Sequence, residues 1–525
     1  MAFRNSLTSW LGRCWHWRWM RVFAIYFACF VAAVTGFHVW MNARGARSWK
    51  ATREMLAKEG VEMDPSKVTG ALVPASENFC AIPLLEGINL VMDRDPMKGE
   101  PAARRKALEA LGVPAYHATH PRPPVVTGSV LAGEPPKLEV WAEWLRKTGH
   151  AMPVTDPGHP AREVLAALSY QDAAVAEMAA AVERPRATFQ SEGRSLLAAE
   201  SMVDLHLTHH STMQGLVSGF VLRSLAAAES GEPGKAHEAA RITARLAEAM
   251  ADEPALFGLL SASTHASLLA YGTWNLCRNH CGTEQDFHKL QRDLERINLR
   301  DSTVKAFQGE AALAIRTIFK LQRSRDKTML GLGGGGAEGV IYQVGLMAIP
   351  RGWFEMNASA MGEWHMNYAV IPLRDHDWPA ALAAQARLER TLHDLREDNW
   401  ERLEMHLARS WSSSLVPRLM IRAARAQSLV DQAVIACALE RHWMERGSYP
   451  ERLADLARPG ERPLPLDVLS ASGAWMGYRR EDGRYLLWSV ALDGTDNDGR
   501  RGGPKTERSD YKGDWVWDFQ RDSAP

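Results

Sequence analysis

Apolar residues recur every three or four positions through most of the chain between residues 160 and 446, which predicts amphipathic helices. Runs such as "STMQGLVSGFVLRSLAAAES" and "STVKAFQGEAALAIRTIFKLQ" are rich in Ala and Leu, and short breaks containing Gly, Pro or Asn separate them. Helices joined by short breaks are expected to pack as antiparallel hairpins. No regular repeat of the tetratricopeptide type is visible, so we expect an irregular helical body.

A different pattern fills residues 22–41, which contain no Asp, Glu, Lys or Arg over 20 positions. A helix of that length matches the hydrocarbon core of a bilayer, about 30 Å. The run is longer than the apolar core of a cleaved signal peptide, about 7–15 residues, and lacks a clear small-residue cleavage site. We therefore expect an uncleaved signal-anchor that crosses a membrane once. Six Trp residues flank or enter this segment, as is typical of membrane interfaces: Trp10, Trp15, Trp17, Trp19, Trp40 and Trp49.

Basic residues do not orient this segment in the membrane, because four precede it and four follow it: Arg4, Arg13, Arg18, Arg21, Arg44, Arg47, Lys50 and Arg53.

The patterns together predict a mainly α protein with six regions. These are a basic and aromatic flank (1–21), a transmembrane helix (22–41), a membrane-proximal helical segment (46–112), a Pro/Gly-rich loop region (113–160), the helical body (161–416) and a small α+β C-terminal domain (417–525).

The C-terminal region begins with a long helix expected over Pro417–Arg446. The stretch "ERGSYPERLADL" then forms a corner, because Gly447 can adopt the left-handed conformation and Pro450 cannot continue a helix. Further on, "GYRREDGRYLLWSV" alternates in the manner of strands around an Asp-Gly pair, which predicts a β-hairpin.

This order of motifs resembles the globular head of the major pseudopilin of type II secretion systems, over roughly residues 417–519. Two positions depart from the family: Val468 follows Asp467 where the family has Pro, and Ala491 replaces a Gly. The predicted membrane segment also lies far upstream instead of continuing into the head's helix, so we expect a borrowed module and not a pilin subunit. The matching residues are Gly447, Tyr449, Pro450, Leu453, Leu456, Pro465, Asp467, Tyr478, Tyr485, Ser489, Asp493 and Gly494.

The resemblance implies a Ca²⁺ site in the acidic turn "LDGTDNDG". Asp493 corresponds to a calcium ligand of the family, and Asp496, Asp498 or Asp514 would supply a later one. Closely spaced oxygen ligands suit Ca²⁺ in general. The alternative is a solvated turn without a metal.

Other groups carry weaker signals. Cys277 and Cys281 have a spacing that zinc tolerates, but no second pair is visible, so buried thiols or one disulfide are favoured. In "HLTHH" (His206, His209 and His210) no Glu lies between the histidines, which does not match a zinc protease motif. "GLGGGG" lacks the Lys-Ser/Thr of a phosphate-binding loop and is interpreted as a flexible loop.

Charge changes the picture only by exclusion: 62 basic and 62 acidic residues leave no basic footprint for nucleic acid. The stretches "LAKEGVEMD", "VPASENFCAIPLL" and "FQGEAALAI", together with the C-terminal motifs, resemble uncharacterised bacterial membrane-anchored proteins that carry the same head. The resemblance implies a single-pass protein of the bacterial inner membrane with a periplasmic body. We expect contact with membrane lipid and with envelope or secretion proteins, and a non-catalytic scaffold role. The alternatives are a hydrolase with a site in the helical body, and glycan binding by Trp353, Trp364 or Trp378 on one surface.

Overall fold

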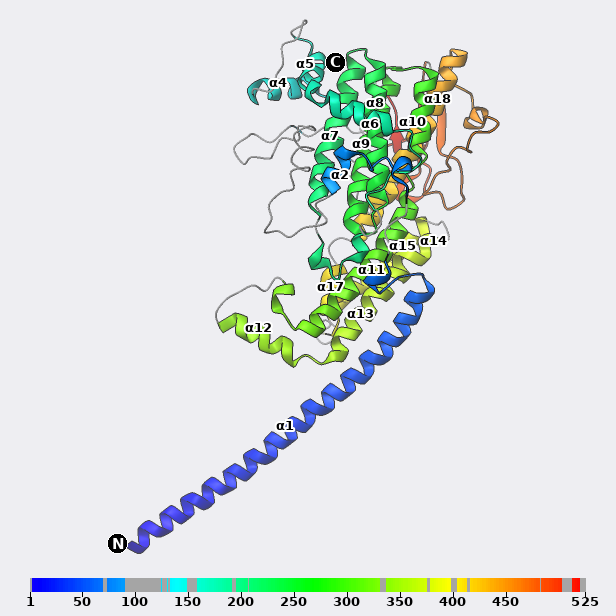
Figure 1. Ribbon diagram of the computed structural model, residues 1–525. Coiled ribbons are helices and arrows are strands. Elements are labelled where there is room, and N and C mark those ends of the chain that lie inside the picture. The colour runs from blue at the N-terminus through cyan, green and yellow to red at the C-terminus, as the bar shows by residue number, and fades with distance from the viewer. Residues whose placement is uncertain are drawn as a thin grey trace.

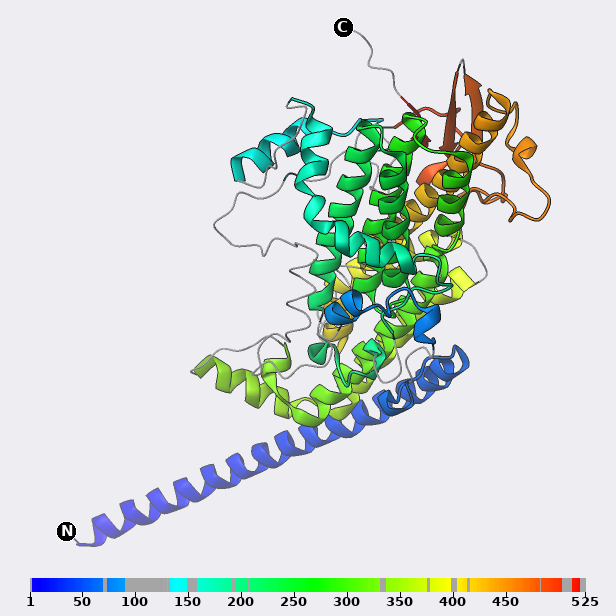
Figure 2. The ribbon, with the colours of Figure 1, turned by 45° about the horizontal axis from the view of Figure 1, so that its top comes forward.

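The fold is described from a computed structural model (Figures 1 and 2). It describes residues 2–68, 73–89, 124, 130, 133–148, 158–190, 195–205, 207–330, 337–374, 378–397, 404–412, 416–481, 483–502 and 512–519, with side chains from residue 19 onward. These ranges are mainly helical, and they include one small sheet. Residues 90–112 of the predicted membrane-proximal segment and the "GLGGGG" loop lie outside the described residues.

A single helix, α1 (Ala2–Lys58), projects from one end of the body (Figure 1). In the described part of the chain, it is the one helix long and apolar enough to cross a membrane. The predicted short helix after residue 46 is not separate, because it continues α1 without a break. Gly60, with φ +76°, follows the end of the helix, as its freedom in the left-handed region predicts.

The body consists of packed helices, some of which contact their neighbours in the chain, as the short breaks predicted, while others contact helices far away in sequence. Three long neighbours, α7, α8 and α9, contact each other, and α9 also contacts α11 and α18. Thr283 caps α10 in a capping box with Asp286, which satisfies free backbone N–H groups. The helices of the body are α2 (Pro83–Asn89), α4 (Leu138–Thr148), α5 (Pro160–Ala167), α6 (Asp172–Ala181), α7 (Thr208–Glu229), α8 (Pro233–Ala251), α9 (Leu256–Arg278), α10 (Glu284–Leu294), α11 (Leu299–Ser324), α12 (Ala337–Ala348), α13 (Arg351–His365), α14 (Ile371–Arg374), α15 (Trp378–Glu397), α17 (His406–Ser412) and α18 (Val416–Arg446).

The C-terminal segment forms a three-stranded antiparallel sheet in the order β1-β2-β3. The hairpin is as predicted, since β1 (Gly477–Glu481) ends and β2 (Arg484–Ser489) begins on either side of the Asp-Gly pair. Register places Tyr478 opposite Leu487, and β3 (Trp515–Trp517) pairs with the other edge of β2.

The corner after α18 is held by a buried carboxyl group. Glu440 accepts a hydrogen bond from the Tyr449 hydroxyl at 2.7 Å, and its other oxygen lies 2.8 Å from Nδ1 of His280. Tyr449 also packs edge-to-face on Tyr485 of β2. The Tyr-Pro pair therefore fixes the chain between α18 and the sheet, and Gly447 adopts the expected left-handed conformation with φ +70°.

Helix α18 belongs to the body and to the C-terminal segment together. One face packs along α9 and α10, and Gln432 donates a hydrogen bond to the backbone oxygen of Trp515 at 2.8 Å. On the body side, Trp274 of α9 donates to the oxygen of Asp518 at 2.8 Å and stacks on Phe519. One hydrophobic core thus runs from the body into the sheet. The boundary placed at residue 417 and the pseudopilin-like character of the segment stay predictions.

Candidate functional sites

Two histidines and a glutamate meet where α7 begins and where α8 turns into α9. His209 and His210 lie in the first turn of α7, and Glu253 lies between the end of α8 and the start of α9. Nε2 of His209 lies 2.7 Å from one carboxylate oxygen of Glu253, and Nε2 of His210 lies 3.1 Å from the other. His209 and Glu253 are buried, and His210 keeps 12% of its side chain exposed. We call these three residues the His–Glu centre.

Close backbone packing fixes the carboxylate of Glu253. A methyl group on Gly258 would lie 2.5 Å from the Glu253 Cβ, and one on Gly309 of α11 would lie 1.9 Å from the Pro254 oxygen. Contacts that short are not tolerated, so both positions require glycine. Glu310 of α11 also accepts the Leu256 N–H at 3.3 Å. The Glu253 loop is therefore held between α9 and α11.

The electrostatics of the His–Glu centre follow from its burial and from its neighbours. Burial opposes the charge on Glu253, but His209 and His210 more than offset it, and the pKa of this carboxyl falls to about 2. His265 lies one helical turn beyond Ser261 on α9, and burial lowers its pKa to about 3, so its imidazole is neutral. Nδ1 of His210 lies 2.8 Å from the Ser261 hydroxyl.

The sequence identified two of the three residues of this centre. It singled out His206, His209 and His210 but found no match to a zinc protease motif. His206 lies outside the described residues, whereas the other two reach a glutamate 44 positions away from His209. No local spacing connects α7 to the α8–α9 corner, and "DEPALFG" reads as an ordinary helix start. Only the packing of the two helices brings Glu253 to the histidines.

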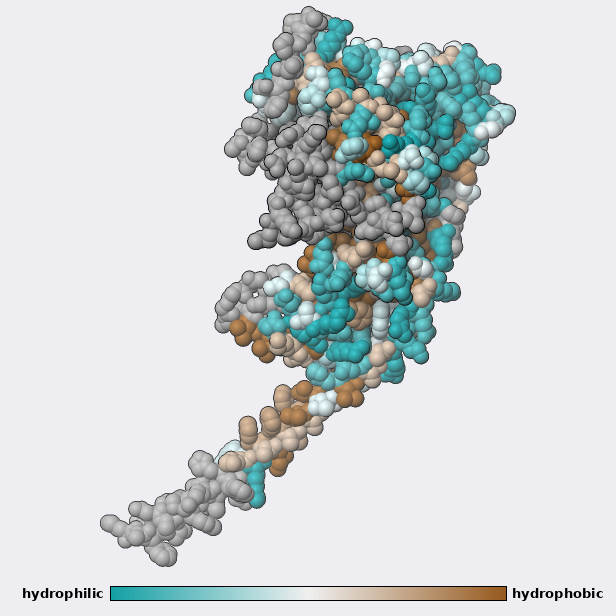
Figure 3. Space-filling model, in the orientation of Figure 1, coloured by the Kyte–Doolittle hydropathy of each residue, from teal (hydrophilic) through white to brown (hydrophobic). Residues whose placement is uncertain are grey.

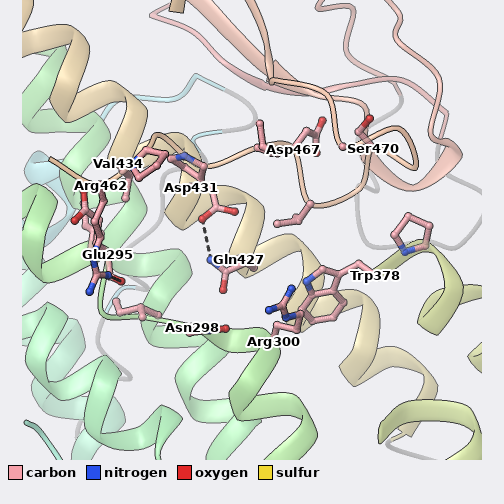
Figure 4. A pocket seen from close by; sticks show the side chains of 18 of the residues that line it. Glu295, Asn298, Arg300, Trp378, Gln427, Asp431, Val434, Arg462, Asp467 and Ser470 are labelled. Atoms are coloured by element: carbon pink, nitrogen blue, oxygen red, sulfur yellow. Dashed lines mark hydrogen bonds between the residues drawn. The ribbon is translucent and has the colours of Figure 1, made fainter. Parts of the chain in front are cut away.

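A second site is a cavity of about 690 Å³ (Figure 4) between α18, the α10–α11 connection, the start of α15 and the loop of residues 462–473. Asp431 and Gln427 project into it from α18, Arg300 and Asn298 approach from the other side, and Trp378 forms part of the wall. A volume of this size accommodates a small ligand or a short peptide segment.

The carboxyl group of Asp431 is the electrostatic feature of this cavity. It accepts a hydrogen bond from Gln427 at 2.8 Å. Burial raises its pKa to about 8, and the negative charge of Asp467 adds to the rise. At neutral pH the group is therefore mostly protonated and can both donate and accept hydrogen bonds.

Asp467 fixes the wall of the cavity to the sheet. Its carboxylate accepts the N–H of Leu469 at 3.0 Å, the hydroxyl of Ser489 at 2.8 Å and the N–H of Val490 at 2.9 Å. Burial raises the pKa of Asp467, while these hydrogen bonds oppose the rise. The loop of residues 462–473 is thereby attached to the end of β2.

The four predicted calcium ligands lie in one loop, and their carboxylates mostly accept backbone N–H groups. Asp514 is buried and accepts the N–H groups of residues 497 and 499, and Asp493 accepts from residues 495 and 513. Asp496 accepts the indole N–H of Trp488 at 2.9 Å, and Asp498 has a left-handed backbone with φ +56°. The loop thus wraps around Asp514, and calcium binding there stays a prediction.

Cys277 and Cys281 are free, buried thiols, which is one of the two predicted states. Burial raises the pKa of both thiols, which disfavours the thiolate that a metal requires. Trp378 is almost fully buried, and Trp353 and Trp364 are half-buried, so they do not form an exposed aromatic platform.

Comparisons of the chain with protein-family models, with curated proteins and with solved structures found no match.

Proposed function

We propose that the protein is a single-pass membrane protein of the bacterial inner membrane whose periplasmic body serves as a non-catalytic scaffold. The observation that carries this proposal is that one uninterrupted helix, α1, has two different halves. Residues 22–40 carry no charge and are exposed apart from the half-exposed His38, whereas Met41, Thr52 and Leu56 are buried against the body. An exposed apolar surface of this length requires lipid or a partner to cover it.

Close helix packing joins this span rigidly to the body. At the crossing of α1 and α13, a methyl group on Gly45 would lie 2.3 Å from the Gly352 oxygen, so the two backbones are nearly in contact. Asn42 accepts the Gly352 N–H at 2.8 Å, and Thr52 donates to Glu363 at 2.8 Å. Because α1 and the body are rigidly connected, the position of α1 in the bilayer also determines the position of the body.

A second apolar surface lies at the same end of the molecule. Helix α12 exposes Val340, Ile341, Val344 and Met347, which share one face at helical spacing. Figures 1 and 3 show this helix at the end of the body from which α1 emerges. In Figure 3 hydrophobic residues also follow α1 and form smaller patches on the body, whose coloured surface is otherwise largely hydrophilic.

The C-terminal end of α12 is fixed to the body. Arg325 donates to the backbone oxygens of Leu346 and Ile349 at 2.8 Å each, and Gln343 donates to the Arg325 oxygen at 2.6 Å. The apolar face is therefore presented outward, which is the arrangement of a helix lying in a membrane interface.

The C-terminal sheet lies at the end of the body remote from α1 (Figures 1 and 2). In a membrane-anchored protein, this places the cavity around Asp431 and the acidic loop away from the lipid. The resemblance to a pseudopilin head supports envelope or secretion proteins as partners, and it supports Ca²⁺ as an ion bound by Asp493 and Asp514. The cavity suits a short segment of such a partner.

Membrane contact is tested by site-directed spin labelling in proteoliposomes. Cys14 and Cys29 are first replaced by serine. A spin label at Val344→Cys is then expected to collide more often with oxygen, which dissolves in lipid, than with a water-soluble nickel chelate. The matched control is Glu389→Cys on the exposed face of α15, which is expected to show the reverse. Equal accessibility to the chelate at both positions would contradict lipid contact by α12.

The scaffold role is tested by affinity capture of the tagged full-length protein from detergent-solubilised membranes. Recovery of secretion or envelope components in fixed amounts would support the proposal. A protein recovered alone that hydrolyses a substrate would overturn it. The second candidate function, a hydrolase, is favoured by one observation, which is the buried His–Glu centre in the helical body.

A further inference from the structure

The His–Glu centre gathers ligand atoms of the types that transition metals prefer. One atom from each of His209, His210 and Glu253 lies within 4.8 Å of the other two. Imidazole nitrogens and a carboxylate oxygen are a common ligand set of zinc and related ions. In the described part of the chain, no other group of three or more His, Cys, Asp or Glu residues comes together in this way.

Two buried polar atoms of His210 and Glu253 face each other without making a well-formed hydrogen bond. Nε2 of His210 and Oε2 of Glu253 are buried and 3.1 Å apart, yet neither has a hydrogen-bond partner in the described residues. The other ring nitrogen of His210, Nδ1, is hydrogen-bonded to the Ser261 hydroxyl. If that nitrogen carries the proton, two lone pairs face each other across the 3.1 Å gap. A positive ion between them resolves this repulsion.

The charge of Glu253 leads to the same conclusion. Its ion-pair partners among the described residues are the two histidines, and none of them is a Lys or Arg. A buried carboxylate without a permanent positive partner is costly. Two protonated histidines packed at a ring separation of 4.3 Å would repel each other. A divalent ion bound by two neutral histidines neutralises the carboxylate without that repulsion.

The surroundings of the His–Glu centre provide rigidity. Gly258 and Gly309 hold the Glu253 loop in place, and the Ser261 hydroxyl orients His210, as an outer partner does for a metal-bound histidine. His210 keeps 12% of its side chain exposed, so the centre lies close to the surface of the body.

We propose that His209, His210 and Glu253 bind one divalent transition-metal ion of the zinc type, with Ser261 as the outer positioning residue. The proposal is independent of membrane anchoring and of the scaffold role. It concerns binding of the ion and assigns no reaction to it.

The test uses full-length protein purified in detergent, stripped with chelator and titrated with Co²⁺. Wild-type protein is expected to bind one equivalent and to develop the visible absorption bands of cobalt held by nitrogen and oxygen. His210→Ala and Glu253→Gln are expected to lose this signal. The matched control is His393→Ala, which removes a histidine from the exposed face of α15 and is expected to change nothing.

Ser261→Ala provides an independent reading, since it removes a single hydroxyl group and is the least disturbing of the changes. Loss of the outer hydrogen bond is expected to weaken cobalt binding about 10–100-fold, with the wild-type helical circular dichroism retained. The proposal is overturned if wild-type protein binds no stoichiometric cobalt. It is also overturned if folded Glu253→Gln or Ser261→Ala protein binds cobalt as tightly as the His393→Ala control.

Discussion

Asp431 allows a quantitative test of the cavity, because its carboxyl titrates in a range accessible to folded protein. The pKa rises from an ordinary value of 3.8 to about 8 on folding. The stability associated with this group is fully present below pH 3.8 and is lost as pH rises toward 8. Asp431→Asn keeps an oxygen to accept the Gln427 N–H and removes the titration.

The size of the effect follows from the shift. Each pH unit between the two pKa values costs about 1.4 kcal/mol. Going from pH 5 to pH 7 therefore costs the wild type about 2.7 kcal/mol relative to Asp431→Asn. Solvent that enters the cavity would screen the ionised group, so we take half of this value, about 1.4 kcal/mol, as the smaller end of the range.

The assay is urea unfolding of full-length protein in detergent at pH 5 and pH 7, followed by circular dichroism. Wild-type protein is expected to lose stability over this interval by about 1.4–2.7 kcal/mol more than Asp431→Asn. Asp394→Asn, a change on the exposed surface of α15, is the control and is expected to follow the wild type. Equal losses for the wild type and Asp431→Asn would refute the reasoning.

Three further changes test packing and hydrogen bonding. Gly352→Ala places a methyl group 2.0 Å from a backbone oxygen of α1 and is expected to cost about 1–3 kcal/mol in thermal unfolding; Gly345→Ala, which meets nothing within 4 Å, should cost nothing, and equal effects would contradict the close crossing. Tyr449→Phe removes the hydroxyl that donates to buried Glu440 and is expected to lower the free energy of unfolding by about 1–3 kcal/mol. An unchanged free energy of unfolding would contradict this hydrogen bond. Asp467→Ala leaves three donors without their acceptor and is expected to speed proteolysis of the loop of residues 462–473; an unchanged cleavage rate would exclude its role as a tether.

Periodicity predicted the helical class, because amphipathic spacing is a local property that the fold preserves. It also predicted α18 to within one residue of its start, the left-handed turn at Gly447 and the β-hairpin, where glycine and proline restrict the backbone. The continuity of α1 beyond the span was missed. Residues 42–45 carry no feature that sequence reasoning treats as a helix, yet α13 packs against them and extends it.

The candidate sites were less accessible to sequence reasoning, because their residues are far apart along the chain. Asp431 reads as one polar residue on a mostly apolar helix, and only the loop of residues 462–473 folding over it creates the cavity. The resemblance drew attention to Asp467 as a family position, but its three hydrogen bonds depend on β2. Glu253 was not noticed, since nothing near it in sequence suggests a site.

The bond from Trp274 to the oxygen of Asp518 joins positions 244 residues apart. At synthesis rates of about 5–20 residues per second, α9 leaves the ribosome about 10–50 seconds before its partner strand. During that interval the indole of Trp274 and its apolar surroundings lack the cover that Asp518 and Phe519 provide in the folded protein. The last residues of the chain therefore complete the apolar core of a helix made much earlier, so the core of the body cannot close fully before synthesis ends.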